Sequence, residues 1–435
     1  SGIERLFAIN AATVAITNRM TVSSAASATD PNANARRNAL ILSVAQAFNG
    51  AGPPIAISLG GLAGFYMLGA DKSLATAPVT GYNVGVALAA LPAAMLMGRI
   101  GRRYGFMTGA LGTLGGMVIC GWALTILNFW LFAVGMMLIG VGAAFVHQYR
   151  FAAADQGDDT FKPKAISWVL AGGIGAAIIG PQLVIWTKDM MLPVQFAGAF
   201  FAGIGLPIVG IAILAFLKFD APMSRADKQL ADTGRPITEI IAQPRFMVSV
   251  ACAVGSYALM SFVMTGAPLA MVGCGISTKN ATLGIQWHVI AMFAPSFFTG
   301  NLIARFGKEK IVVAGLLILV ACASVGLIGL ELWNFWLALV LLGIGWNFGF
   351  IGATSMLTDT YRPEEKSKAQ GANDFLLFGC VAFASLRSGR VINAWGWDAV
   401  NIVVLPVVAI CLVLLAILAR SERRNPSTSR NIHDA

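Results

Sequence analysis

Residues 94–103 of this chain read Ala-Met-Leu-Met-Gly-Arg-Ile-Gly-Arg-Arg, and residues 300–309 repeat the pattern as Gly-Asn-Leu-Ile-Ala-Arg-Phe-Gly-Lys-Glu. In both stretches an apolar run ends in Arg-x-Gly followed by a basic residue. Glycine permits a tight turn, and basic residues favour the cytoplasmic side of a membrane. Each stretch therefore predicts a short cytoplasmic loop between two membrane-spanning helices.

The composition is that of a membrane protein. Of the residues, 57% are hydrophobic and only 11% are charged, whereas a soluble domain carries roughly 25% charged residues. A spanning helix needs about 20 mostly apolar residues. Such runs predict an all-α membrane fold with twelve transmembrane helices in two six-helix bundles, at 39–68, 78–98, 105–124, 127–148, 164–186, 193–217, 246–272, 280–304, 311–330, 333–357, 368–392 and 399–420.

The distribution of basic residues predicts the orientation in the membrane. With an even number of spans, both termini lie on one side, and the other side receives only Lys72, Lys188, Lys279, Arg387 and Arg390. The termini's side thus carries 25 of the 30 Lys and Arg, and we expect it to be cytoplasmic. The net charge of +10 is then accounted for by membrane orientation, and no nucleic-acid partner is expected.

Polar segments divide the chain into five parts. The longest internal polar stretch separates the two predicted bundles, and the stretch before Met20 reads either as added sequence or as an upstream reading frame. The predicted parts are a polar N-terminal tail (1–38), a first bundle (39–217), a cytoplasmic linker (218–245), a second bundle (246–420) and a cytoplasmic tail (421–435).

The repeated loop resembles the loop signature of the major facilitator superfamily, and the resemblance covers about residues 39–420. The family's pattern has an Asp before the first Arg, where this chain has Gly98 and Ala304, so the charge relay attributed to that Asp is not expected here. The resemblance implies secondary transport by two bundles that rock about a central site. It also implies a role in conformational change for Arg99, Gly101, Arg102, Arg103, Arg305 and Gly307.

Two spans carry soft metal ligands at helical spacing. Met260 and Met264 are four residues apart in the seventh span, as are His288 and Met292 in the eighth, so each pair shares one helix face. Counted from the outer ends, Met264 and His288 lie about 12 Å deep, and Met260 and Met292 about 18 Å. Thioethers select Cu(I) and imidazole suits copper, although methionine is also a routine apolar filler. The pattern favours a copper site.

These two pairs resemble the metal-binding motif of the CcoA-type bacterial copper importers, a group within the same superfamily. The resemblance implies import of copper across the bacterial inner membrane, for assembly of cbb3-type cytochrome c oxidase, with copper as cargo and no organic cofactor. Cys252 and Cys274 match functional cysteines of that group. They are 22 residues apart, about 33 Å along one helix, too far for a disulfide. We expect a thiol relay into and out of the site.

Two other functions stay open on the sequence. One is efflux of a drug or small metabolite by a permease of the same superfamily, and the other is a membrane copper sensor or assembly factor that does not transport. No nucleophile–base or metal–carboxylate grouping lies at membrane depth, so an enzyme is not expected. The expected partners are the copper ion, membrane lipid and a cytoplasmic copper-accepting protein, with the chain acting as a monomer.

Overall fold

The computed structural model describes residues 33–154, 161–219, 234–362 and 365–424. The first half of the chain forms nine helices in this part: α2 (Ala33–Asn49), α3 (Gly52–Met67), α4 (Ala77–Ile100), α5 (Arg102–Thr125), α6 (Phe129–Val146), α7 (Tyr149–Ala154), α8 (Lys162–Thr187), α9 (Ala197–Gly203) and α10 (Gly205–Leu214). No strand occurs among the residues described.

The second half begins with a short helix, α12 (Ile237–Ile241), which precedes the long helix α13 (Pro244–Gly273). The rest of this half consists of α14 (Thr278–Phe293), α15 (Ser296–Phe306), α16 (Lys308–Ile328), α17 (Leu332–Leu357), the 3-10 turn η3 (Thr358–Thr360) and α18 (Lys366–Arg424). Proline in the first turn of α3, α4, α8 and α13 suits a helix start.

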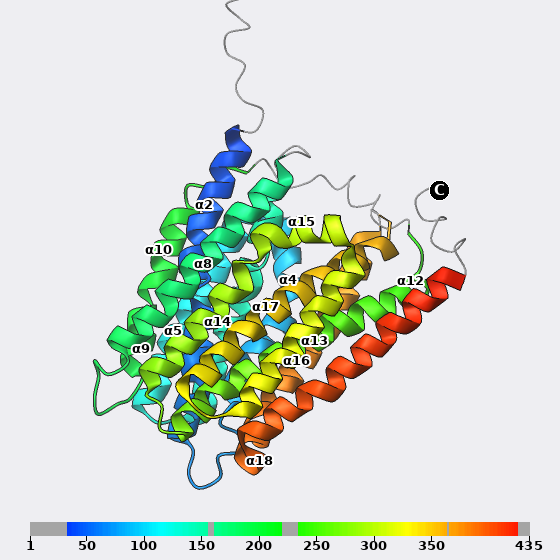
Figure 1. Ribbon diagram of the computed structural model, residues 1–435. Coiled ribbons are helices and arrows are strands. Elements are labelled where there is room, and N and C mark those ends of the chain that lie inside the picture. The colour runs from blue at the N-terminus through cyan, green and yellow to red at the C-terminus, as the bar shows by residue number, and fades with distance from the viewer. Residues whose placement is uncertain (1–32, 155–160, 220–233, 363–364, 425–435) are drawn as a thin grey trace, which may run out of the picture.

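The described helices make twelve membrane crossings if α2 and α3 are joined, α14 and α15 are joined, and α18 is divided in two. The segment Ala33–Met67 is a single apolar run, and α14 and α15, bent by 42°, form one broken span. With 59 residues, α18 would be about 89 Å long, roughly three times the bilayer core. Its backbone leaves helical geometry at Gly396, with φ of 76°. Residues 366–395 and 397–424 are therefore two crossings, as Figure 1 shows at the bend of α18.

The predicted all-α membrane fold is confirmed, and the predicted spans lie close to the helices observed. α2 begins at Ala33, inside the stretch predicted as a polar tail; residues 1–32 lie outside the described part. The domain boundaries stay predictions.

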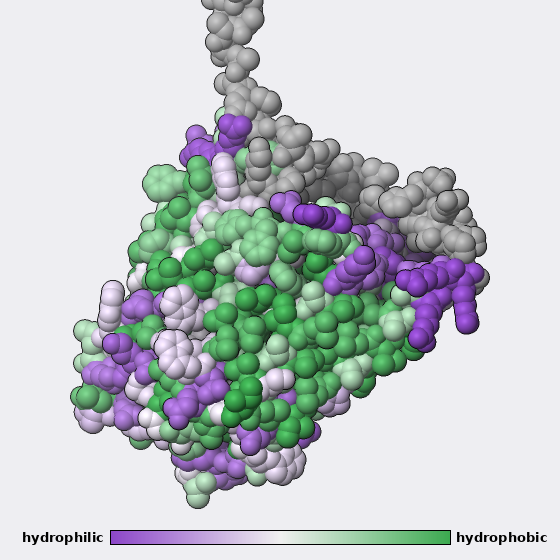
Figure 2. Space-filling model, viewed as in Figure 1, coloured by the Kyte–Doolittle hydropathy of each residue, from purple (hydrophilic) through white to green (hydrophobic). Residues whose placement is uncertain are grey.

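The surface separates into an apolar middle and polar ends. Figure 2 shows apolar residues across the middle of the face in view, over α13, α16 and α18, with hydrophilic residues gathered at either end. Below, "basic face" denotes the end carrying the loops at 99–103 and 305–310, and "opposite face" denotes the end carrying residues 68–76 and Gly396.

The two repeated loops have the same backbone geometry. Gly101 ends α4 and begins α5 with φ of 84° and ψ of 157°, and Gly307 ends α15 and begins α16 with φ of 93° and ψ of 154°. A positive φ strains any residue with a side chain. The repeat in the sequence is therefore a repeat of one strained turn.

Replacing Gly101 with alanine is expected to destabilise the protein through backbone strain alone. A Cβ at Gly101 would meet no atom within 4 Å, so the expected cost is about 1–2 kcal/mol. The measurement is thermal unfolding of the purified protein in detergent. Gly300→Ala is the matched control, because Gly300 is helical and equally open. Equal melting temperatures for the two variants would contradict the account.

The second loop is held by a charge network that the sequence did not suggest. Arg245 at the start of α13 bonds Glu309 at 2.6 Å, Asp359 at 2.9 Å and Glu422 at 2.8 Å. Lys308 pairs with the same Asp359. The network ties α13, α16, η3 and the end of α18 together at the basic face.

The end of the predicted linker is fixed to the second half by one buried carboxylate. Arg235 donates to Glu365 from Nε at 2.8 Å and from Nη2 at 2.7 Å, and its backbone N–H adds a third bond at 2.9 Å. The Glu365 side chain is fully buried. Hydrogen bonds from Arg235 lower the pKa of Glu365 from 4.5 to about 2.

Glu365→Gln is expected to reduce stability by about 1–3 kcal/mol at neutral pH, because Arg235 loses its ionised partner. Since the folded-state pKa is depressed, this contribution is full above pH 4.5 and disappears as the pH falls toward 2. Melting temperatures of the wild type and the variant should therefore converge over that range. A gap between them that stays constant down to pH 2 would refute this role for Glu365.

Candidate functional site

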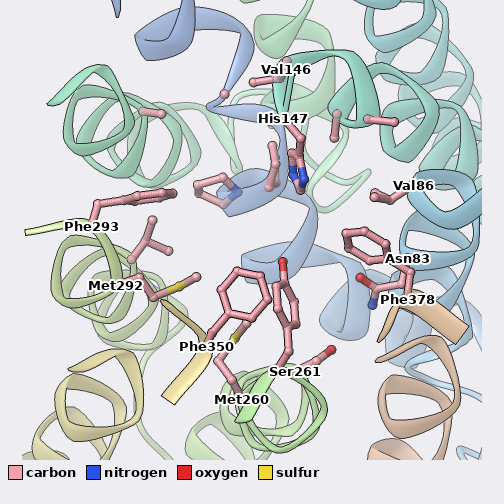
Figure 3. A pocket seen from close by; sticks show the side chains of 18 of the residues that line it. Asn83, Val86, Val146, His147, Met260, Ser261, Met292, Phe293, Phe350 and Phe378 are labelled. Atoms are coloured by element: carbon pink, nitrogen blue, oxygen red, sulfur yellow. The ribbon is translucent and has the colours of Figure 1, made fainter. Parts of the chain in front are cut away.

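A central cavity lies between the two halves of the molecule. Its walls come from α2, α3, α4, α6, α7 and α8 on one side and from α13, α14, α17 and α18 on the other. Figure 3 shows side chains converging on it from several directions. Its volume of ≈ 220 Å³ far exceeds the roughly 10–15 Å³ that a single water requires. The space suits a small organic molecule better than a single coordinated ion.

Four aromatic side chains from three helices form one wall of this cavity. Tyr257 of α13 lies at the centre of the cluster, with ring centroids at 5.4 Å from Trp346, 5.3 Å from Phe350 and 5.9 Å from Phe378. Trp346 and Phe350 of α17 stack at 5.2 Å with an interplanar angle of 15°. We call Tyr257, Trp346, Phe350 and Phe378 the aromatic wall. Such a surface favours flat, π-rich ligands.

The cavity also has polar and charged groups. Asn83 of α4 and Ser261 of α13 face into it in Figure 3, and Gln46 of α2 lines it as well. Arg150 of α7 and Asp374 of α18 approach from opposite halves. A mostly apolar cavity with a few convergent polar groups is the usual form of a small-molecule site.

The two halves are joined by hydrogen bonds on the side of the cavity toward the opposite face. Thr76 donates to the Ser385 carbonyl at 3.1 Å and accepts from the Gly389 N–H at 3.2 Å. Deeper in the membrane, Gln182 of α8 donates to Gln286 of α14 at 2.8 Å. These contacts close the opposite face between α4 and α18 and between α8 and α14.

The four residues predicted to bind copper are only partly brought together. Met260, Met264 and Met292 line the cavity, and Figure 3 shows Met260 and Met292 at its edge. His288 is fully buried and does not line the cavity, and its Nδ1 lies 2.8 Å from the Leu339 carbonyl oxygen. Its Nε2 has no hydrogen-bond partner in the described structure.

The two cysteines predicted to form a relay lie away from the cavity. Cys252 is buried in the core beside Cys411, whereas Cys274 caps the end of α13 and is exposed. Neither lines the cavity. Among the described residues, His, Cys, Asp and Glu side chains form no group of three that could hold a metal ion.

The sequence profile of the Major Facilitator Superfamily matches residues 65–295 and 287–434. The chain belongs to the major facilitator superfamily. This membership confirms the family predicted from the loop repeat, and it also confirms that the protein is a membrane transporter and not an enzyme.

Relatives within the superfamily resemble the chain over most of its length. It is 51% identical over 382 residues to the riboflavin transporter RfnT of Brucella anthropi, covering 88% of this chain and 95% of that protein. It is 31% identical to the uncharacterised transporter YddS of Bacillus subtilis, over 81% and 84% of the two chains. The E. coli fucose:proton symporter FucP shares the major facilitator fold, with a TM-score of 0.59, 16% identity, and 88% and 98% coverage.

The prediction of copper import is wrong, and so is the prediction of copper as the partner. A relative at 51% identity over nearly the whole chain is a riboflavin transporter, and the narrower resemblance to CcoA-type importers finds no support. The physical reason is that methionine serves equally as ligand and as apolar lining. The predicted copper-accepting partner protein depended on copper being the cargo, so that prediction is wrong as well.

Proposed function

We propose that this protein is a secondary transporter of riboflavin, working by alternating access. The observation that carries the proposal is the aromatic wall inside the central cavity, taken with the 51% identity to a riboflavin transporter. Riboflavin transport corresponds to the small-metabolite alternative and takes the place of copper import. The proposal concerns the substrate and not the direction of transport.

The chemistry of riboflavin matches the lining of the cavity. Its isoalloxazine ring is flat, tricyclic and π-rich, and stacking of such rings on aromatic side chains contributes about 1–3 kcal/mol per ring. Its ribityl chain carries hydroxyl groups, which the side chains of Gln46, Asn83 and Ser261 can bind. Met260, Met264 and Met292 give an adaptable apolar surface for the rest of the ring.

We further propose that the basic face is cytoplasmic in the inner membrane of a bacterium. The loops at 99–103 and 305–310 and the described chain ends at Ala33 and Arg424 lie on that face, as the positive-inside rule favours. With the opposite face closed by Thr76 and Gln182, the described conformation would be closed toward the periplasm.

The proposal is tested in a bacterial riboflavin auxotroph that lacks its own transporter. We expect cells carrying this protein to take up radiolabelled riboflavin saturably at micromolar concentrations. Unlabelled lumiflavin, which retains the ring without the ribityl chain, should compete. Trp395→Ala is the matched control, since Trp395 is exposed near the opposite face and the variant should behave as wild type. Uptake equal to that of the empty vector, with the protein present in the membrane, would overturn the proposal.

A further inference from the structure

Two opposite charges face the central cavity from the two halves without pairing. Arg150 lies on α7 and Asp374 on α18, and both line the cavity. No ion pair joins these two described residues, and their charged nitrogen and oxygen atoms lie more than 4.0 Å apart. An ionisable side chain within a membrane span is costly and is usually retained for function.

Both groups have hydrogen-bonding capacity to spare. Arg150 Nε is buried without a partner, and the guanidinium group lies over the Phe151 ring at 4.8 Å from its centroid. Asp374 accepts one bond at Oδ1 from its neighbour Asn373 at 3.0 Å. The site therefore presents a cationic donor opposite an anionic acceptor, with a net charge near zero. A neutral ligand that carries an acceptor next to a donor would satisfy both.

The aromatic wall adjoins this pair of charges. Tyr257, at the centre of the wall, lines the same cavity as Arg150 and Asp374. Phe378 follows Asp374 by four residues on α18 and so lies on the same helix face. A flat ring that packs on the wall would thus present one edge to the two charges.

We infer that Arg150 and Asp374 bind the imide edge of a flavin ring, with the guanidinium donating to a ring carbonyl and the carboxylate accepting the imide N–H. This inference rests on the proposed function and specifies which edge of the ligand is recognised. Hydrogen bonds to charged groups are the strong ones. Methylation of the imide nitrogen removes the hydrogen bond to Asp374 and places a methyl group against its carboxylate.

The test compares riboflavin with N3-methylriboflavin as competitors of labelled riboflavin uptake. In the wild type, N3-methylriboflavin should inhibit at least 10-fold less well than riboflavin. In Asp374→Ala the two inhibitors should agree within 2-fold, and in Asp374→Asn the ratio should fall at least 3-fold below that of the wild type. Glu331→Ala, at an exposed carboxylate on the opposite face, should keep the wild-type ratio.

Arg150→Lys separates the two roles, because lysine keeps the charge but loses the planar fork of donors. This variant should bind riboflavin more weakly and keep its discrimination against the N3-methyl compound. Equal inhibition by the two compounds in the wild type would overturn the inference, as would an unchanged ratio in Asp374→Asn. Either result with riboflavin uptake intact leaves the proposed function standing, whereas absence of uptake in the wild type overturns the function itself.

Discussion

A disulfide between cysteines introduced at Thr76 and Gly389 is expected to abolish transport, and a reductant should restore it. Thr76 holds α4 to α18 through Ser385 and Gly389. A Cβ built on Gly389 would lie 3.1 Å from the Thr76 Cβ, close to the separation of about 3.5–4.5 Å found in disulfides. Alternating access requires each face to open in turn, so fixing the opposite face closed stops the cycle.

The experiment is best done with Cys274 and Cys380 replaced by serine, since both are exposed. Thr76→Cys alone, treated with the same oxidant, and the double variant kept reduced are the matched controls and should retain their activity. Gly389→Cys alone is unsuitable, because its Cβ would lie 2.4 Å from the Thr76 Oγ1. Bond formation is verified by mass spectrometry of a peptide digest. Undiminished transport by protein that is shown to be crosslinked would contradict this account of the closed face.

Tyr257→Ala is expected to weaken riboflavin binding by about 5- to 150-fold, the equivalent of the 1–3 kcal/mol that an aromatic stack contributes. Tyr257 contacts the other three rings of the aromatic wall, so its removal takes away one surface and loosens the others. The measurement is the concentration of riboflavin that gives half-maximal uptake.

Tyr257→Phe is the matched control for this variant. It keeps the ring and loses only the hydroxyl, so it should stay within about 5-fold of the wild type, in line with a single hydrogen bond. Tyr257→Ala with wild-type affinity would show that the ligand does not stack on this wall. If both variants lost the same affinity for riboflavin, the hydroxyl of Tyr257, and not its ring, would make the contribution to binding.

Much of the fold was predictable, because the bilayer imposes one length scale on every crossing. Apolar runs of about 20 residues and the Arg-x-Gly repeat located the spans and the turns at Gly101 and Gly307. The structure adds local geometry that hydropathy does not encode. α18 breaks only at Gly396, and the eighth span is bent between α14 and α15.

The site was less predictable, because its parts lie far apart in the sequence. Tyr257, Trp346 and Phe378 come from three helices and share no spacing that a sequence pattern could reveal. The predicted spans 127–148 and 368–392 place Arg150 just outside one span and Asp374 near the end of another, so neither residue was predicted to be functional. A usable signal was present at Asp374, which lies eight residues into α18, about 12 Å along the helix. Depth within a span, judged residue by residue, would have singled it out.

The Met and His motif misled for a related reason. Spacing of four residues places two side chains on one helix face but does not say what that face contacts. His288 faces the Leu339 carbonyl instead of the cavity, while the methionines line a cavity shared with aromatic rings.

The most direct test of the central claim is counterflow in proteoliposomes that contain only the purified protein. Vesicles loaded with excess unlabelled riboflavin are diluted into a trace of labelled riboflavin, so that exchange is recorded whatever the direction of net transport or the coupling ion. We predict transient accumulation of the label above equilibrium, reduced by Tyr257→Ala and absent from protein-free vesicles. Label that never exceeds the level in protein-free vesicles would contradict the account.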